Sequence, residues 1–151
     1  MGTLLSINIS KGGVPKRSRE SCLVTASGLQ GDRQRDLEYH GGPTRAVCLY
    51  SQDLIDALRA EGHPISAGTI GENFTLGGVP WSGMVPGAQI DVGEVRLELT
   101  DYAVPCNNIA GSFQGRRMVR VSQKVHPGWS RLYARVLKEG TVRIGDRVER
   151  A

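Results

Sequence analysis

Apolar and polar side chains alternate over the first ten residues of the chain, where Leu5, Ile7 and Ile9 are separated by short polar residues. A period of two is typical of a β-strand with one buried and one solvated face. Residues 21–27 predict a second strand, and the apolar run at residues 45–51 predicts a buried one. The first third of the chain is therefore expected to be rich in strands.

Five further short runs have the length and composition of strands: residues 73–76, 89–92, 95–100 and the two halves of residues 141–149. Only Gly93 and Glu94 separate residues 89–92 from residues 95–100, which predicts a tight hairpin. Gly145 and Asp146 lie between the two halves of the last segment and predict a turn there.

One segment shows the spacing of an amphipathic helix. Ser51 can cap a helix, because its hydroxyl can accept a hydrogen bond from an exposed backbone N–H of the first turn. Leu54, Ile55 and Leu58 then form one apolar face, and Gly62 ends the pattern. We therefore expect a short helix directly after the buried strand.

A second helix is predicted over residues 129–138, with Gly140 as its C-terminal cap. The apolar positions that recur at helical spacing are Leu132, Tyr133, Val136 and Leu137. Residues 105–124, which come before it, have a mixed pattern that favours a loop with short helical pieces. This segment lies between the last strand of the hairpin and the predicted helix.

The length and composition limit the fold class. The 151 residues fit one domain, so residues 1–151 are interpreted as a single unit. Twenty glycines and only two phenylalanines indicate many tight turns between short strands. With many strands and a few short α-helices, the chain is predicted to be mainly β, with a closed or nearly closed, barrel-like sheet.

Charge and hydropathy narrow the function classes. The formal net charge is +4, and the basic residues are dispersed rather than gathered in a stripe with aromatic residues, so nucleic-acid binding is not expected. The first apolar run, residues 4–9, is too short for a signal peptide, and no run approaches the roughly 20 residues of a membrane span. We expect a cytoplasmic protein that does not bind membranes. An anionic small molecule, such as a phosphorylated cofactor, would suit the dispersed cations.

The three cysteines differ in their surroundings. An odd number without a Cys-x-x-Cys pair argues against a disulfide framework. Cys22 and Cys48 have apolar neighbours and are interpreted as small buried side chains. Cys106 lies between Pro105 and two asparagines, in a polar loop, where a thiol is expected to be exposed and reactive. Cys106 is therefore the sharpest candidate for a chemical role.

Two glycine-rich stretches supply further candidates. In residues 28–47, Arg33 and Arg45 could clamp a phosphate, and His40 could donate a hydrogen bond or shuttle a proton. Alternatively, the Asp–Arg pair in this stretch is only a surface ion pair, and residues 41–43 form an ordinary turn. Glu72 and Asn73 lie at a glycine turn before a strand, from which side chains could point into a barrel mouth. Alternatively, these two residues only stabilise the turn, since an Asn side chain readily forms hydrogen bonds with nearby backbone groups.

Taken together, these stretches resemble the MOSC family, named from the C-terminal domain of molybdenum-cofactor sulfurase. Four blocks match its pattern in order. They are GLQGDR (28–33) with HGGPTRAV (40–47), then GENF (71–74), then VPC (104–106), and finally GWSRLYARV (128–136) with GD (145–146). No block is specific by itself, but all four in this order are hard to obtain by chance, and the match spans residues 11–148.

The resemblance implies a β-rich fold like the barrel domain of pyruvate kinase and a molybdenum–molybdopterin cofactor. Cys106 matches the family's cysteine and is expected to ligate molybdenum or to carry a sulfur atom. Relatives with demonstrated chemistry reduce small N-hydroxylated compounds to amines, and His40 is the second catalytic candidate. The residues expected to hold the cofactor are Lys16, Arg33, Arg45, Glu72 and Asn73.

The chain is also expected to lack modules that larger relatives carry: an N-terminal barrel domain, an aminotransferase-like sulfurase domain, and iron–sulfur or flavin modules. Electrons would then come from separate donor proteins, or sulfur from a pyridoxal-phosphate-dependent sulfurase. Besides a reductase of N-hydroxylated compounds, a persulfide carrier or a module that binds and delivers the cofactor stays open. A non-catalytic interaction domain is the third reading, against which the intact Cys106, Asn73, Arg45 and His40 argue.

Overall fold

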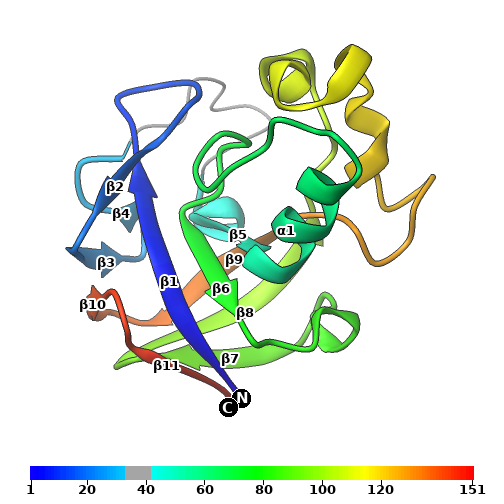
Figure 1. Ribbon diagram of the computed structural model, residues 1–151. Coiled ribbons are helices and arrows are strands. Elements are labelled where there is room, and N and C mark those ends of the chain that lie inside the picture. Colours follow the sequence, from blue (N-terminus) through cyan, green and yellow to red (C-terminus); the bar gives the residue numbers. More distant parts are fainter. Residues whose placement is uncertain (33–41) are drawn as a thin grey trace.

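The computed structural model describes residues 1–32 and 42–151, so two predicted site residues, Arg33 and His40, lie outside the described residues. The described part is mainly β (Figure 1). Its strands are β1 (Gly2–Ile9), β2 (Arg17–Arg19), β3 (Ser21–Thr25), β4 (Gly28–Leu29), β5 (Val47–Ser51), β6 (Phe74–Gly77), β7 (Gln89–Val92), β8 (Val95–Tyr102), β9 (Leu132–Lys138), β10 (Gly140–Arg143) and β11 (Arg147–Arg150).

The main sheet closes on itself. Its strand order is β11-β7-β8-β9-β5-β6-β1, and β1 pairs back onto β11 through Gly2↔Val148 and Thr3↔Arg147. Closure leaves these strands without a free edge along that seam, which confirms the predicted barrel-like sheet. Strand β2 pairs with β1 in antiparallel orientation, while β3, β4 and β10 form a small second sheet. The N- and C-termini lie side by side at one end (Figure 1).

Strands β5 and β6 are the parallel pair of the barrel, and parallel neighbours need a crossover connection. The helix α1 (Gln52–Ala60) supplies part of it. As predicted, the Ser51 hydroxyl caps this helix by accepting a hydrogen bond from the Leu54 N–H at 3.2 Å. Ile55 and Leu58 are completely buried, so the apolar face of α1 packs onto the barrel.

The predicted hairpin is also confirmed. Strands β7 and β8 are antiparallel, with Val92 opposite Val95, and Gly93 in the turn has φ +56°. A left-handed backbone at this position favours glycine, which has no Cβ to clash. Beyond β8 come three short 3-10 turns, η3 (Asn107–Ser112), η4 (Gln114–Arg116) and η5 (Met118–Val121), as the mixed pattern of residues 105–124 predicts.

The helix predicted over residues 129–138, with Gly140 as its cap, is wrong. Residues 132–138 form β9, which is paired with β5 on one side and β8 on the other. Leu132 and Ala134 face the main core, whereas Tyr133 between them packs into a separate cluster with Cys48 and Ala103. Because both faces of the strand are covered at this end, its apolar residues do not alternate, and the run imitates helical spacing.

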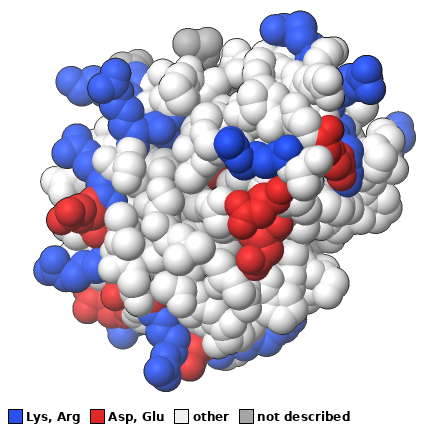
Figure 2. All heavy atoms as spheres, viewed as in Figure 1, with Lys and Arg blue, Asp and Glu red and all other residues white. Residues whose placement is uncertain are grey.

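On the face seen in Figure 2, Lys and Arg are interspersed with Asp and Glu. This distribution matches the dispersed charge expected from the sequence. Among the residues that the structure describes, no helix has the length and apolar character needed to cross a membrane.

Candidate functional site

Cys106 lies where two hollows of the surface meet. It follows β8 in a short loop and precedes η3, and its carbonyl accepts a hydrogen bond from the Ile109 N–H at 3.1 Å. Its side chain is partly exposed, as predicted for a thiol in a polar loop. Both hollows include Cys106, Asn108 and Tyr133 in their walls.

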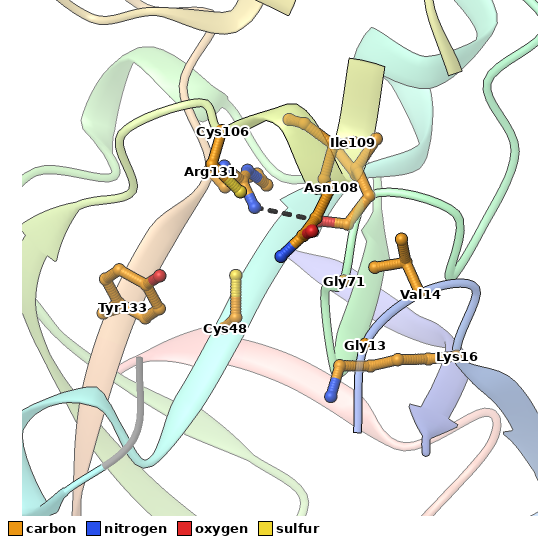
Figure 3. A pocket seen from close by; sticks show the side chains of 11 residues that line it. Gly13, Val14, Lys16, Cys48, Gly71, Cys106, Asn108, Ile109, Arg131 and Tyr133 are labelled. Carbon is orange, nitrogen blue, oxygen red and sulfur yellow. Dashed lines mark hydrogen bonds between the residues drawn. The ribbon is translucent and has the colours of Figure 1, made fainter. Parts of the chain in front are cut away.

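The inner hollow is small, with a volume of about 50 Å³. Two thiols, those of Cys48 and Cys106, face into it, together with the side chains of Lys16 and Arg131 (Figure 3). These four side chains come from β5, from the loop after β8, from the segment before β2, and from the residue before β9. The inner hollow therefore brings soft sulfur and positive charge together.

The outer hollow is larger, with a volume of about 630 Å³, and reaches from Cys106 toward the end of η5. Tyr102, Val104, Pro105 and Tyr133 give it a largely apolar and aromatic wall. Its remaining wall carries charged and polar groups, which are Arg45, Asp101, Asn108, Ser122, Gln123 and Lys124. A planar organic molecule with an anionic group would suit such a wall.

Lys16 is held in place by a buried ion pair. Its ammonium group lies 2.7 Å from a carboxylate oxygen of Asp32, with 3% and 4% of the two side chains exposed. The Lys16 backbone N–H donates to the Gly68 carbonyl at 2.9 Å. Gly68 has φ +84°, and a Cβ added there would lie 2.5 Å from the Lys16 carbonyl oxygen. Only glycine allows this close approach of the two loops.

Asn73 lies behind the inner hollow and joins three segments. Its side-chain amide donates to the Asn8 carbonyl at 3.2 Å and to the Asp32 carboxylate at 2.9 Å. Its side-chain oxygen accepts from the Cys48 N–H at 2.9 Å, and its own N–H donates to the Cys48 carbonyl at 2.7 Å. Asn73 therefore fixes the positions of Cys48 and of the Lys16–Asp32 pair.

Glu72 is completely buried next to Asn73. One carboxylate oxygen accepts from the Thr75 hydroxyl at 3.1 Å, and the other has no hydrogen-bond partner among the described residues. Burial raises the pKa of this carboxyl to about 7, although backbone N–H groups, Thr75 and the Arg131 charge act in the opposite direction. Glu72 is thus a buried group that can hold a proton near neutral pH.

Arg131 is the site residue that the sequence reasoning missed. Its side chain is buried, and its guanidinium donates to the carbonyls of Ile70 at 2.9 Å and Val104 at 3.3 Å. It thereby ties the glycine turn before Glu72 to the loop that carries Cys106. Its Nε has no hydrogen-bond partner among the described residues. The signal in the sequence was the GWSR segment, which entered only as part of a family block.

Arg45 lies in the wall of the outer hollow. Its guanidinium carbon is 5.2 Å from the centre of the Tyr133 ring, a cation–π distance, and Nη2 lies 3.8 Å from Asp101. About a third of the Arg45 side chain is exposed.

Cys48 is buried, as predicted, but the prediction did not include its contact with the inner hollow. It forms part of the floor of the inner hollow (Figure 3). Burial raises the pKa of its thiol to about 11, with nearby Arg131 acting against the rise. At neutral pH this thiol keeps its proton.

The predicted site residues that the structure describes thus fall into three groups. Lys16 and Cys106 line the inner hollow, with Cys106 also in the wall of the outer one, which contains Arg45. Glu72 and Asn73 are buried behind these walls and position other groups. Within residues 1–32 and 42–151, no three His, Cys, Asp or Glu side chains gather into a ready-made metal site.

In the comparison with protein families, residues 36–149 match the model described as the MOSC domain. An uncharacterized protein, YflK of Bacillus subtilis, is 31% identical over 139 residues, which cover 91% of this chain and 62% of that protein. YiiM of Escherichia coli is 26% identical over 112 residues, covering 71% of this chain and 50% of its own length. The chain therefore spans less than two thirds of these curated relatives.

Solved structures show the same fold. The crystal structure of YiiM from Escherichia coli superimposes with a TM-score of 0.76 at 21% identity, covering all of this chain and 70% of the other. That of YiiM from Geobacillus stearothermophilus gives a TM-score of 0.74 at 22% identity, covering all of this chain and 75% of the other.

Proposed function

The chain belongs to the MOSC domain family, and from that premise we propose that the cleft around Cys106 holds a molybdenum cofactor. One observation carries the proposal: a partly exposed thiol lies at the junction of two hollows, and the cations Lys16 and Arg131 also line the inner one. In this proposal Cys106 provides a thiolate ligand, and the chain's other residues bind and orient the pterin.

The residues present fit this cofactor. A thiolate is a soft ligand, which suits a metal that arrives with the two sulfurs of its own pterin. Arg131 has an Nε without a partner among the described residues, and the ammonium of Lys16 can donate more bonds than the one it gives Asp32. Both are suited to an anionic phosphate. Arg45 offers a third cation from the outer hollow.

We propose further that the protein reduces small N-hydroxylated compounds to amines. When bound, the cofactor supplies the two-electron removal of oxygen. The chain would orient the substrate between the apolar wall of the outer hollow and Cys106, and Arg45 and Lys124 would attract anionic substituents. Separate donor proteins would deliver the electrons.

The test uses protein produced in a host that makes molybdopterin. Molybdenum and pterin are quantified, and amine formation from an aromatic amidoxime is measured with a reduced viologen as electron donor. The native chain should carry molybdenum and pterin in near-equal amounts. Cys106→Ser should lose amine formation and keep its circular dichroism spectrum and Tm. The matched control Cys22→Ser changes a cysteine of another sheet and should behave like the native chain. Amine formation retained by Cys106→Ser would refute the mechanism.

A second function is favoured by the size of the inner hollow. A space of about 50 Å³ beside Cys106 can receive one additional sulfur atom, and Lys16 and Arg131 would stabilise the anion of a persulfide. The protein would then carry sulfur that a pyridoxal-phosphate-dependent sulfurase supplies. Mass spectrometry separates the two functions, because a carrier would show one added sulfur on Cys106 without bound molybdenum.

A further inference from the structure

We propose that Cys48 and Cys106 form a dithiol pair that closes reversibly to an intramolecular disulfide, so that the cleft is also a site of oxidative modification. The two thiols come from β5 and from the loop after β8, far apart in the sequence. They nevertheless face one hollow of about 50 Å³. Figure 3 shows both sulfur atoms pointing into this hollow, toward each other.

Cys48 is the fixed member of the pair. Its backbone is bonded to Asn73 through both its N–H, at 2.9 Å, and its carbonyl, at 2.7 Å. It is also paired with Tyr133 in the register of β5 and β9. Its thiol is shielded from solvent, which protects it from direct attack by an oxidant.

Cys106 is the adjustable and accessible member. It lies outside the strands, between the end of β8 and η3, and its side chain is partly exposed. The outer hollow of about 630 Å³ leads directly to it. A disulfide requires Cα atoms about 4.4–6.8 Å apart, and a loop residue can adjust to this range more easily than a strand residue.

Tyr133 links the two thiols structurally. It packs against Cys48 in a small apolar cluster and lines the hollows beside Cys106. The same aromatic side chain therefore packs against Cys48 and shares the walls of both hollows with Cys106.

The chemistry requires an oxidant, for which we name a hydroperoxide. The Cys106 thiol releases its proton to solvent, and the thiolate attacks the terminal peroxide oxygen. The O–O bond breaks, the alkoxide or hydroxide that leaves takes up a proton from solvent to become an alcohol or water, and the transferred OH remains on Cys106 as a sulfenic acid. The Cys48 sulfur then attacks the Cys106 sulfur. The S–S bond forms, the S–O bond breaks, and the hydroxyl leaves with the Cys48 proton as water. The two thiols lose two electrons, which the peroxide accepts.

The consequence rests on the proposed function. A disulfide would remove the Cys106 thiolate that is proposed to bind molybdenum, and a dithiol reductant would restore it. Oxidation would therefore block cofactor loading and protect Cys106 from irreversible oxidation to sulfinic acid.

The experiment is done on the full chain made without the cofactor. It is treated with hydrogen peroxide, unfolded, alkylated and digested with trypsin. The three cysteines fall on three different tryptic peptides, residues 20–33, 46–59 and 97–116. We expect a crosslink between residues 46–59 and 97–116 that dithiothreitol reverses, with the peptide of Cys22 still alkylated.

Two variants test whether Cys48 is the partner of Cys106. In Cys48→Ala, Cys106 should proceed to sulfinic acid several-fold faster than in the native chain. In the matched control Cys22→Ala, the same crosslink should form as in the native chain. Sulfinic acid on Cys106 with Cys48 still reduced in the native chain, or a crosslink to Cys22, would overturn the proposal. Because the crosslink is measured without the cofactor, its result does not depend on whether the protein binds molybdenum.

Discussion

The ammonium of Lys16 lies 2.7 Å from the carboxylate of Asp32, and almost none of either side chain is exposed. Asp32 also accepts hydrogen bonds from the Ser10 N–H at 2.9 Å and from the Asn73 side chain at 2.9 Å. The pair therefore joins the segment that forms one wall of the inner hollow to the beginning of β6. Two opposite charges in such a place depend on each other, because neither has water to replace its partner.

Replacing Lys16 by Met should destabilise the fold strongly. The Asp32 carboxylate would remain buried without its counter-charge, which typically costs about 3–5 kcal/mol. Urea denaturation followed by circular dichroism measures the free energy of unfolding. Lys11→Met is the matched control, because Lys11 is exposed and its replacement should change stability by less than about 0.5 kcal/mol. A loss in Lys16→Met no larger than in the control would show that the pair does not hold this wall.

Glu72→Gln should change how stability depends on pH. The folded state raises the Glu72 pKa from 4.5 to about 7, so between these values the folded chain binds a proton that the unfolded chain releases. The stabilising contribution is fully present below pH 4.5 and is lost as the pH rises through 7. In that window the free energy of unfolding should fall by roughly 1 kcal/mol per pH unit relative to Glu72→Gln.

Chemical denaturation at a series of pH values from 4.5 to 7.5 tests this slope. Glu20→Gln serves as the control because Glu20 is an exposed carboxylate, and its replacement should leave the slope as in the native chain. Parallel pH dependence in the native chain and Glu72→Gln would mean that Glu72 does not take up the proton on folding.

Local features were predictable from the sequence, and features that depend on register were not. The cap at Ser51 and the hairpin turn at Gly93 are set by residues within a few positions, and both predictions are confirmed. The strand β9 was mistaken for a helix because its two faces pack into different clusters, with Leu132 and Ala134 in the main core and Tyr133 in a separate cluster. No local pattern records those clusters.

The site residues show the same difference between local and long-range features. Cys106 could be singled out because its polar neighbours indicate an exposed loop. The role of Arg131 could not, because its two acceptors, the carbonyls of Ile70 and Val104, are distant in the sequence. Cys48 was correctly expected to be buried, but its position on the floor of the inner hollow depends on the pairing of β5 with β9.

Asn73→Asp is a nearly isosteric change that should be destabilising at neutral pH. The new carboxylate would keep an acceptor for the Cys48 N–H, but its second oxygen would face the Asn8 carbonyl and the Asp32 carboxylate. We expect a loss of about 2 kcal/mol or more at pH 7, because donors are replaced by a like charge. The loss should shrink as the pH falls and the carboxyls take up protons.

Thermal unfolding of Asn73→Asp at pH 5 and pH 7, with Asn107→Asp as the exposed control, distinguishes this effect from a general cost of added charge. The prediction fails if both variants lose the same stability, or if the loss in Asn73→Asp does not grow with pH.

Arg131→Met should loosen the loop that presents Cys106. The guanidinium bridges the carbonyls of Ile70 and Val104, and Val104 is only two residues from the thiol. Met keeps much of the side-chain stem but donates nothing, so two carbonyls lose a charged donor, and stability should fall by about 1–3 kcal/mol. More informative than this loss is the rate at which a maleimide alkylates Cys106 under native conditions. A loop held less firmly should expose the thiol more often and raise that rate several-fold. Arg135→Met, which changes an exposed arginine in the strand β9 that follows Arg131, should leave it unchanged. Equal alkylation rates in the two variants would show that Arg131 does not control access to Cys106.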